Sequence, residues 1–361
     1  MQEAGNNSQQ WQAENMYITV GIDEKRAREI YQEMNLQLRK DYSQEALKIA
    51  ESRVTEFENK LLPKMEAVEG ALEAFADPGF QLLLVEAQKT AASTERPADY
   101  DLLSELLIHR YQKGSDRVIR TGISRAVEIV DKISNDALLG LTLIYSVSFI
   151  PETGDIQQGL KVLNNLFGKL LYDNLPTGDE WLEHLDILDA IRISNSGRLI
   201  SIEELYSKTL DGYINIGIEK NSDDYSKALN ILGENGLPRN ILVDHALNSD
   251  YIRINWLDKN NLSSMILERS VHQDNQPSIK KCPLSETQIN AIKSIYNLYK
   301  TDELIKQQNV RIFMEEWDKQ PNLKTLREWW GSIGVSLKLT SIGKILAHSN
   351  AQRCANIPSL Y

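Results

Sequence analysis

The chain has 361 residues, of which 42% are hydrophobic, and this is enough for a buried core and roughly two or three domains. The formal net charge of −11 comes from 51 acidic and 40 basic residues, so binding to nucleic acid is disfavoured unless a local basic patch provides it. Cys282 and Cys354 form no CxxC pair, which indicates a reducing compartment and no disulfide scaffold.

The start of the chain, Met1 to Ala4, has neither the basic stretch nor the apolar core of a signal peptide, so we expect a cytoplasmic protein. The longest apolar stretch, residues 137–150, is shorter than the roughly 18 residues that a membrane-spanning helix needs. It predicts a buried helix and no membrane span.

Residues 1–21 form a polar tail in which apolar side chains alternate with polar ones and which ends at Gly21. The apolar set is Trp11, Ala13, Met16, Ile18 and Val20. This alternation predicts a strand, and a single strand cannot bury its apolar face alone, so we expect it to pair with another copy in a homo-oligomer. A disordered tail is the alternative interpretation.

Apolar residues at helical spacing predict a helical domain over residues 22–176. Asp23 is the expected N-cap of its first helix, which we expect to break at residues 41–43. The predicted helices after the break are 43–62, 63–75, 78–92, 97–114, 115–132, 137–150 and 156–172.

Short alternating runs after Gly178 predict a mixed α+β region over residues 177–275. We expect a helix over 178–191, strands at 198–201, 213–218 and 251–256, a hairpin that joins 241–247 to 251–256, and a linker at 272–277. One helical turn at 241–247 is the alternative to the first strand of the hairpin.

Residues 276–361 read as a helical C-terminal region with a winged-helix-like end. Ser285 and Gln288 form a capping box for a helix over 286–299. The other expected elements are helices 302–319 and 322–331, a strand at 335–339 and a helix at 344–349. The fold class is therefore mainly α and multi-helical, with an N-terminal strand tail and a small mixed α+β middle region.

Trp329 and Trp330 are neighbours in a predicted helix, and adjacent helical residues point about 100° apart. We therefore expect one indole to be exposed or covered by another domain or chain. Burial of both against the final segment is the alternative.

The best candidates for catalytic residues, although none belongs to a known motif, are Glu180, His184 and Asp189. Glu180 and His184 are spaced i, i+4 on a predicted helix, where they could ligate a metal or pair a base with its orienting carboxylate. No HExxH motif accompanies them, and the chain contains neither a phosphate-binding GxxxxGK[ST] nor a GxGxxG motif. An exposed ion-pair face is the alternative, and we expect no metal and no cofactor.

A basic cluster surrounds the turn at Gly114 and predicts docking of an anionic ligand or an acidic partner. Arg117 and Arg120 share a helical face. The full set is Arg110, Lys113, Arg117, Arg120 and Arg125. The alternative is that these residues neutralise carboxylates within the fold.

Four segments together resemble a family of uncharacterised bacterial proteins known by locus-tag names. They are Gly5-Asn6-Asn7-Ser8 with Gln12-Ala13, Leu102 to Ile108, Trp181 to Leu188, and Leu339 to Gly343. The resemblance spans nearly the whole chain and implies no particular activity. Its glycine-asparagine-serine tail before a charged helix is also similar to components of bacterial anti-phage systems, which implies a tail that promotes assembly.

These patterns favour a non-enzymatic, self-assembling interaction, scaffold or sensor protein in bacterial anti-phage defence. Its expected partners are further copies of the chain, bound through residues 1–21, or another protein. The alternatives are a hydrolase-type or metal-dependent enzyme with an inter-domain site around His184, and a winged-helix nucleic-acid binder.

Overall fold

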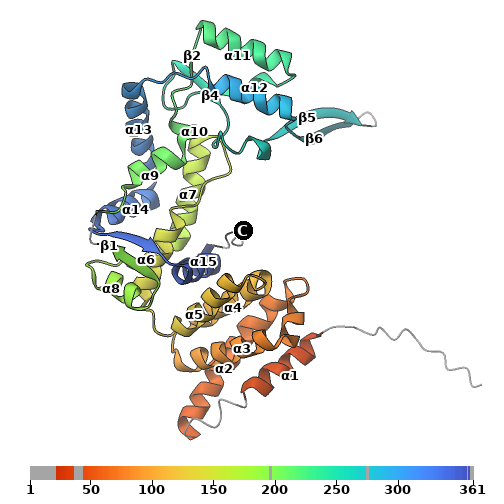
Figure 1. Ribbon diagram of the computed structural model, residues 1–361, viewed down its shortest axis with the longest axis vertical. Coiled ribbons are helices and arrows are strands. Elements are labelled where there is room, and N and C mark those ends of the chain that lie inside the picture. Colours follow the sequence, from red (N-terminus) through yellow and green to blue (C-terminus); the bar gives the residue numbers. More distant parts are fainter. Residues whose placement is uncertain (1–21, 36–43, 195–196, 274–275, 356, 358–361) are drawn as a thin grey trace, which may run out of the picture. The chain divides into compact units, whose positions relative to one another are not determined.

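The computed structural model describes residues 22–35, 44–194, 197–273, 276–355 and 357. The predicted strand tail of residues 1–21 lies outside the described residues. The chain divides into two compact units, unit 1 up to Lys132 and unit 2 from Ile133 onward, and helices predominate in both (Figure 1). The fold is mainly α, as expected. The boundaries placed near residues 176 and 275, and the winged-helix description of the C-terminal end, stay predictions.

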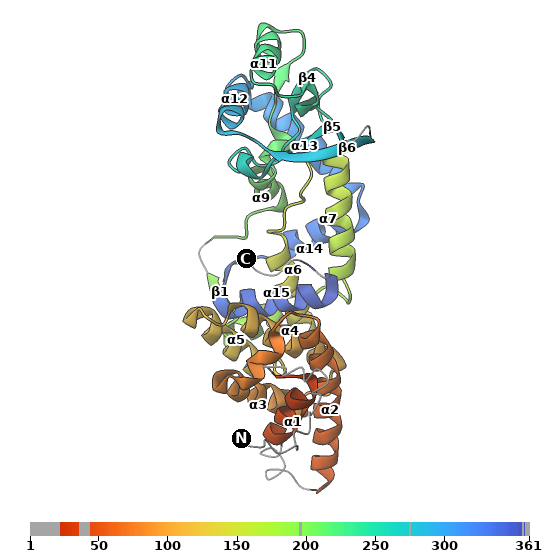
Figure 2. The ribbon, with the colours of Figure 1, turned by 90° about the vertical axis from the view of Figure 1, so that its right-hand side faces the viewer.

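The described part of unit 1 is all-helical. Helix α2 packs against α3 and α4, and α5 packs against the same two helices (Figures 1 and 2). The core is filled by large apolar side chains such as Phe57, Phe80 and Leu103, each at most 1% exposed. The elements are α1 (Glu24–Asn35), α2 (Gln44–Glu66), the 3-10 helix η2 (Ala71–Ala76), α3 (Pro78–Ser93), α4 (Pro97–Lys113) and α5 (Arg117–Ile129).

The helix starts of unit 1 follow from its capping residues. The Asp23 carboxylate accepts a hydrogen bond from the Arg26 amide at 2.8 Å, which confirms the predicted N-cap. Asp77 caps α3 by accepting from the Phe80 amide at 2.7 Å, and Pro97 is the first residue of α4, where its missing N–H costs nothing.

The predicted helix start at Pro63 is wrong, because Pro63 lies inside α2. The Ala67 amide donates to the Pro63 carbonyl at 3.1 Å, so the helix continues past the proline. A proline near a helix end removes one backbone hydrogen bond and kinks the helix less than it would in the middle. The chain then turns at Gly70, whose φ of 71° is left-handed, before η2 begins.

The first part of unit 2 surrounds a buried helix. Every residue from Ala137 to Ile144 of α6 is buried, which confirms the buried helix expected there. Helix α6 packs against α15, α8 and α7, and α7 packs against α14 and α15. The bounds are α6 (Asn135–Ser146), α7 (Ile156–Leu170), α8 (Glu180–Ile187), α14 (Pro321–Ser332) and α15 (Ser341–Ala355).

A two-stranded antiparallel sheet joins distant parts of the chain in unit 2. Strand β1 (Ile191–Ser194) pairs with β7 (Ser336–Leu339) in the register Ile191↔Leu339. The predicted strand at 335–339 is confirmed, whereas β1 was not predicted. The predicted helix over 178–191 is too long, because α8 ends at Ile187 and Ile191 begins β1.

A three-stranded antiparallel sheet has the order β2-β4-β3. It consists of β2 (Ile218–Glu219), β3 (Leu242–Asp244) and β4 (Tyr251–Ile254), so the predicted hairpin is confirmed. The predicted strand at 198–201 is wrong, because Ser201 instead caps α9 (Ile202–Thr209) by accepting from the Glu204 amide. Most of the predicted strand 213–218 is also wrong, because α10 (Asp211–Ile214) occupies its first part.

The predicted linker at 272–277 is wrong as well. Strands β5 (Ile266–Gln273) and β6 (Gln276–Pro283) pair antiparallel from Ile266↔Pro283 to Gln273↔Gln276. Polar residues can form such a ribbon because the backbone pairing does not depend on side-chain polarity.

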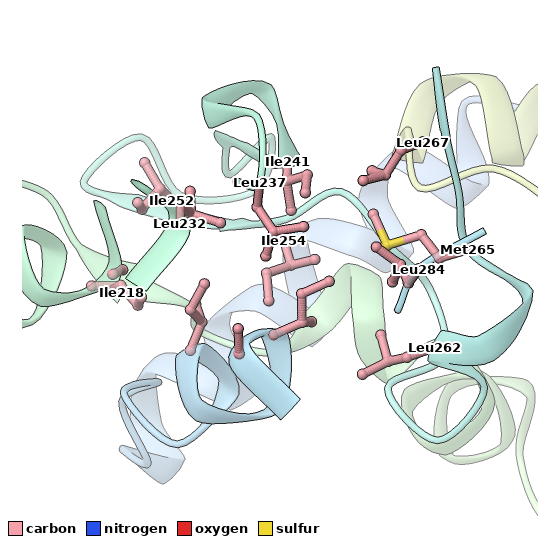
Figure 3. Packing of buried hydrophobic residues seen from close by; sticks show 14 residues of the cluster. Ile218, Leu232, Leu237, Ile241, Ile252, Ile254, Leu262, Met265, Leu267 and Leu284 are labelled. Atoms are coloured by element: carbon pink, nitrogen blue, oxygen red, sulfur yellow. The ribbon is translucent and has the colours of Figure 1, made fainter. Parts of the chain in front are cut away.

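An apolar cluster holds this second part of unit 2 together (Figure 3). It joins Ile252 and Ile254 of β4 to Leu232 of α11 and to buried residues of α12, of which Ile292 and Ile295 are 0% exposed. The predicted capping box of Ser285 and Gln288 at the start of α12 is confirmed. The remaining elements are α11 (Asp223–Glu234), η3 (Arg239–Ile241), η4 (Leu262–Ser264), α12 (Glu286–Tyr296) and α13 (Glu303–Asp318).

Both neighbouring indoles of α14 are buried, so of the expected outcomes, exposure of one indole is wrong, whereas cover by a distant segment of the chain holds for both. Trp329 is 6% and Trp330 is 4% exposed. The two side chains point apart, and each is covered by a different segment: the Trp329 Nε1 donates to the Pro176 carbonyl at 2.9 Å, and the Trp330 Nε1 donates to the Ile200 carbonyl at 2.7 Å.

Among the described helices, none combines the length and the apolar character that a membrane crossing requires.

Candidate partner-binding surface

The five predicted basic residues lie around the connection between α4 and α5 in unit 1. Arg110 and Lys113 belong to the last turn of α4, and Arg117, Arg120 and Arg125 belong to α5. Asp116 begins α5 by accepting hydrogen bonds from the Val118 and Ile119 amides at 2.7 and 3.3 Å. This cap fixes the start of α5 and therefore the positions of its arginines.

Two of these basic residues meet at a hollow of about 680 Å³. Arg110 and Arg120 form part of its wall together with Asp77, Thr121 and Ser124, and the first residues of α3 complete it. Lys113, Arg117 and Arg125 lie outside the hollow. The predicted cluster is thus divided: two of its residues line the hollow, and the other three do not.

The basic residues differ in how their charge is used. Arg110 pairs with Asp77 at 3.3 Å, and only 11% of its side chain is exposed. Arg125 pairs with Glu128 at 2.6 Å. In the part of the chain that the structure describes, Arg117 and Arg120 have no carboxylate partner, so their charge is available to a binding partner.

Gly114 positions the Arg110 side chain. A Cβ at residue 114 would lie 1.8 Å from Nη1 of Arg110, and 2.3 Å from the Arg110 backbone carbonyl. The guanidinium group therefore folds back over a residue that has to be glycine. His109 on the same helix adds no charge at neutral pH, because burial, with the nearby Lys113 charge, lowers the pKa of His109 to about 4.

Two exposed apolar side chains border the hollow and were not predicted. Leu82 on α3 is 74% exposed and Val118 on α5 is 69% exposed. Leu82 follows Pro78 by one helical turn, and Val118 precedes Thr121 by one turn, so both lie beside the lining of the hollow. The sequence does contain a signal for their exposure, because each residue falls outside the i, i+3, i+4 pattern of buried residues on its helix.

We call this region, made of Leu82, Arg110, Val118, Arg117 and Arg120, the arginine surface. It combines the guanidinium groups of Arg117 and Arg120, which have no carboxylate partner among the described residues, and the paired Arg110 with two solvent-exposed apolar side chains. Such a mixture is typical of protein interfaces, in which arginine and apolar groups are enriched over lysine.

The catalytic candidates lie in and just after α8 of unit 2. The His184 Nε2 accepts a hydrogen bond from the Ser134 amide at 3.3 Å, at the start of α6. Asp189 has a φ of 58° and pairs with Arg192 at 2.6 Å, and Glu180 is exposed in the first turn of α8. Within the described residues, no three His, Cys, Asp or Glu side chains gather as a metal site.

A protein-family model with the description ":-like" matches residues 21–360, and the chain belongs to that family. The match begins at the last residue of the N-terminal tail and covers both units. No curated protein and no solved structure matches the chain.

Proposed function

We propose that the protein is a non-enzymatic, self-assembling interaction protein in which residues 1–21 of one copy bind the arginine surface of a neighbouring copy. The observation that supports this proposal is that Arg117 and Arg120 of α5, which have no carboxylate partner among the described residues, lie on the same helix as the exposed Val118, with the exposed Leu82 on α3 beside the hollow that Arg120 lines. A surface of this kind needs an acidic and apolar partner.

The composition of the tail complements that of the surface. Residues 1–21 contain Glu3 and Glu14 and no lysine or arginine, and they carry apolar side chains that include Trp11 and Ile18. Carboxylates can accept bidentate hydrogen bonds from guanidinium groups, and the apolar residues can cover Leu82 and Val118. Charge complementarity also speeds association and selects the partner.

The first experiment measures solution mass by light scattering after size exclusion. We expect the full chain to be an oligomer, and a version lacking residues 1–21 to be a monomer. The double variant Arg117→Glu/Arg120→Glu should also be a monomer, because it turns attraction into repulsion. The matched control is Arg311→Glu/Lys324→Glu, which makes the same charge change at exposed residues of unit 2 and should stay oligomeric.

Two results would contradict the proposal. If the truncated version keeps the mass of the full chain, the tail is not an assembly device. If the truncation is monomeric but Arg117→Glu/Arg120→Glu keeps the full mass, the tail assembles elsewhere and the arginine surface is not its receptor.

A peptide of residues 1–21 tests the contact directly. Labelled peptide should bind the truncated protein in fluorescence anisotropy, and the double arginine variant should weaken this binding about tenfold or more, as loss of charge-assisted hydrogen bonds implies. Higher salt should weaken it further, since exposed charges are screened.

We place this assembly in bacterial anti-phage defence and in the cytoplasm, and the resemblance of the tail to components of such systems supports this placement. Plaque counts on cells that produce the full chain, compared with cells that produce the Arg117→Glu/Arg120→Glu variant, test this placement. Equal plaque counts on both strains and on cells without the protein would argue against it.

A further inference from the structure

A cavity of about 890 Å³ lies in unit 2, well away in sequence from the arginine surface. Its wall is built by α10, the loop after β4, the C-terminal half of α12 and the turn into α13. A second cavity of about 290 Å³ shares Asp211, Asn215 and Tyr296 with it. The larger volume lies in the range of small-molecule sites.

We propose that this cavity binds a nucleoside phosphate, with the phosphates at its lysines and the base beside Tyr296. This goes beyond the proposed assembly and would make the protein a sensor of that ligand.

Four lysines line the cavity, and they come from separate segments: Lys259, Lys293, Lys300 and Lys306. Asp211 forms ion pairs with two of them, with Lys306 at 3.2 Å and with Lys259 at 3.8 Å. Lys300 lies 3.7 Å from Glu219, where both side chains are about half exposed. Lys293 has no carboxylate partner in the described part of the chain, so its charge is available to a ligand, and Lys300 shares its charge only with the half-exposed Glu219.

Two other carboxylates border the cavity and reduce its charge only in part. Asp302 caps α13 by accepting from the Leu304 and Ile305 amides at 2.9 and 3.1 Å, so its charge is balanced by the start of the helix. Glu303 follows it in the first turn. The chain as a whole is acidic, but the cavity wall has more lysines than carboxylates. The wall therefore carries a local positive charge, which favours binding of an anion.

Two buried polar atoms of the wall have no partner among the described residues. They are the hydroxyl of Tyr296 and the side-chain oxygen of Asn215, and both residues line both cavities. Leaving such a group without a hydrogen bond is unfavourable, so a ligand that satisfies both is favoured. Burial raises the pKa of Tyr296, so its hydroxyl remains a donor at neutral pH.

A nucleobase meets both needs, because its edge carries acceptors for the Tyr296 hydroxyl and donors for the Asn215 oxygen. Its flat face suits the aromatic wall, where the Tyr296 and Tyr299 rings lie 5.0 Å apart. Phosphate oxygens suit lysines, which act as compact point charges. A bare phosphate would leave Tyr296 and Asn215 unsatisfied.

The wall is held in place by hydrogen bonds that a ligand does not have to provide. The Tyr299 hydroxyl accepts from the Ile254 amide of β4 at 2.7 Å, and the Lys300 amide donates to the Gly217 carbonyl at 2.9 Å. These contacts fix the turn that carries Lys300 against the three-stranded sheet. The site is therefore formed before a ligand arrives, which limits the entropy lost on binding.

Isothermal titration calorimetry on the full chain tests the proposal, with ATP, GTP, CTP and UTP as probes and inorganic tripolyphosphate and adenosine as comparisons. At least one nucleotide should bind, and more tightly than tripolyphosphate or adenosine. Lys293→Gln/Lys300→Gln should weaken it about tenfold or more, because the phosphates lose two charge-assisted hydrogen bonds. The control Lys227→Gln/Lys324→Gln, which removes two exposed lysines outside the cavity, should not.

Tyr296→Phe separates the two halves of the ligand. It should weaken the nucleotide and leave the affinity for tripolyphosphate unchanged. If no nucleotide binds at millimolar concentration, or if the lysine variant binds as well as the control, the cavity is not a phosphate site. If tripolyphosphate binds as tightly as every nucleotide, or if Tyr296→Phe weakens neither, the base has no place in the cavity and the nucleoside part of the proposal is wrong. None of these outcomes bears on solution mass, so failure here is distinct from failure of the proposed assembly.

Discussion

Unit 1 and unit 2 differ in how far apart along the chain their contacting elements lie. In unit 1, neighbouring helices such as α3, α4 and α5 pack on one another. In unit 2, α6 packs against α15, α7 packs against α14, and β1 pairs with β7. Contacts within a short stretch form early and cost little loop entropy, whereas distant contacts need most of the chain in place.

The comparison implies that each unit has its own core and its own sensitivity to change. Unit 1 should depend on helix ends and local packing. Unit 2 should depend on side chains that hold distant segments together.

Trp317→Ala should destabilise unit 2 by about 3–5 kcal/mol, as is usual for loss of a buried large aromatic side chain. Trp317 is 0% exposed, its ring lies 4.6 Å from that of Tyr206, and its Nε1 donates to the Leu323 carbonyl at 2.8 Å. Calorimetry should show one unfolding transition at lower temperature and the other unchanged. A joint shift of both transitions would mean that the units do not unfold separately.

Arg253→Met should cost unit 2 about 3 kcal/mol, because it leaves buried carbonyl groups without donors. Arg253 is 2% exposed and donates to the carbonyls of Gly212 and Ile254 at 3.1 Å each, and to that of Gly154. It thus connects the segment before α7 with α10 and β4. Chemical denaturation measures the loss, and Arg239→Met, at an exposed position, should leave stability almost unchanged.

Acid should weaken both units through one buried histidine in each. Burial lowers the pKa of His109 in unit 1 and of His245 in unit 2 to about 4. The unfolded chain binds these protons near pH 6.5, so between pH 6.5 and 4 it binds more protons than the folded chain, and stability falls as the pH falls. Above pH 6.5 this stabilisation is complete.

The expected loss is about 2 kcal/mol per histidine between pH 6.5 and 5. Denaturation at a series of pH values measures it. His245→Gln should flatten the pH dependence of unit 2 and leave that of unit 1 as it was. An unchanged slope for unit 2 would show that other groups cause its acid sensitivity.

Asp116→Ala should cost unit 1 about 1 kcal/mol, a typical value for loss of an N-cap. The Val118 and Ile119 amides lose their acceptor at the start of α5. Asp116→Asn is the matched control, because asparagine also caps helices well, and it should restore most of the loss. If alanine and asparagine cost the same, the charge and not the cap stabilises α5.

The sequence predicted unit 1 better than unit 2 for the same physical reason. Asp23 and Pro97 mark helix starts through local chemistry, so they could be recognised without knowledge of the fold. Pro63 was misjudged because a proline near a helix end is compatible with either a start or a continuation. Strand β1 and the β5–β6 ribbon were missed because their partners, not their own patterns, make them strands.

The same limit applies to the sites. Arg117 and Arg120 could be grouped from their helical spacing, but the exposure of Leu82 and the ion pair of Arg110 follow only from packing. The lysine-lined cavity could not be predicted, because its four lysines lie on different elements and none belongs to a motif. The burial of both Trp329 and Trp330 likewise depended on which distant segments cover them.

The placement of the tryptophans has a spectroscopic consequence. Of the six in the chain, Trp11 belongs to the tail, and the other five all lie in unit 2, whereas residues 22–132 contain none. Removal of residues 1–21 therefore gives a protein whose indole fluorescence comes from unit 2 alone. Emission excited at the red edge of the indole band would report on unit 2, while helical ellipticity would report on both units, so their unfolding can be followed separately in a single unlabelled sample.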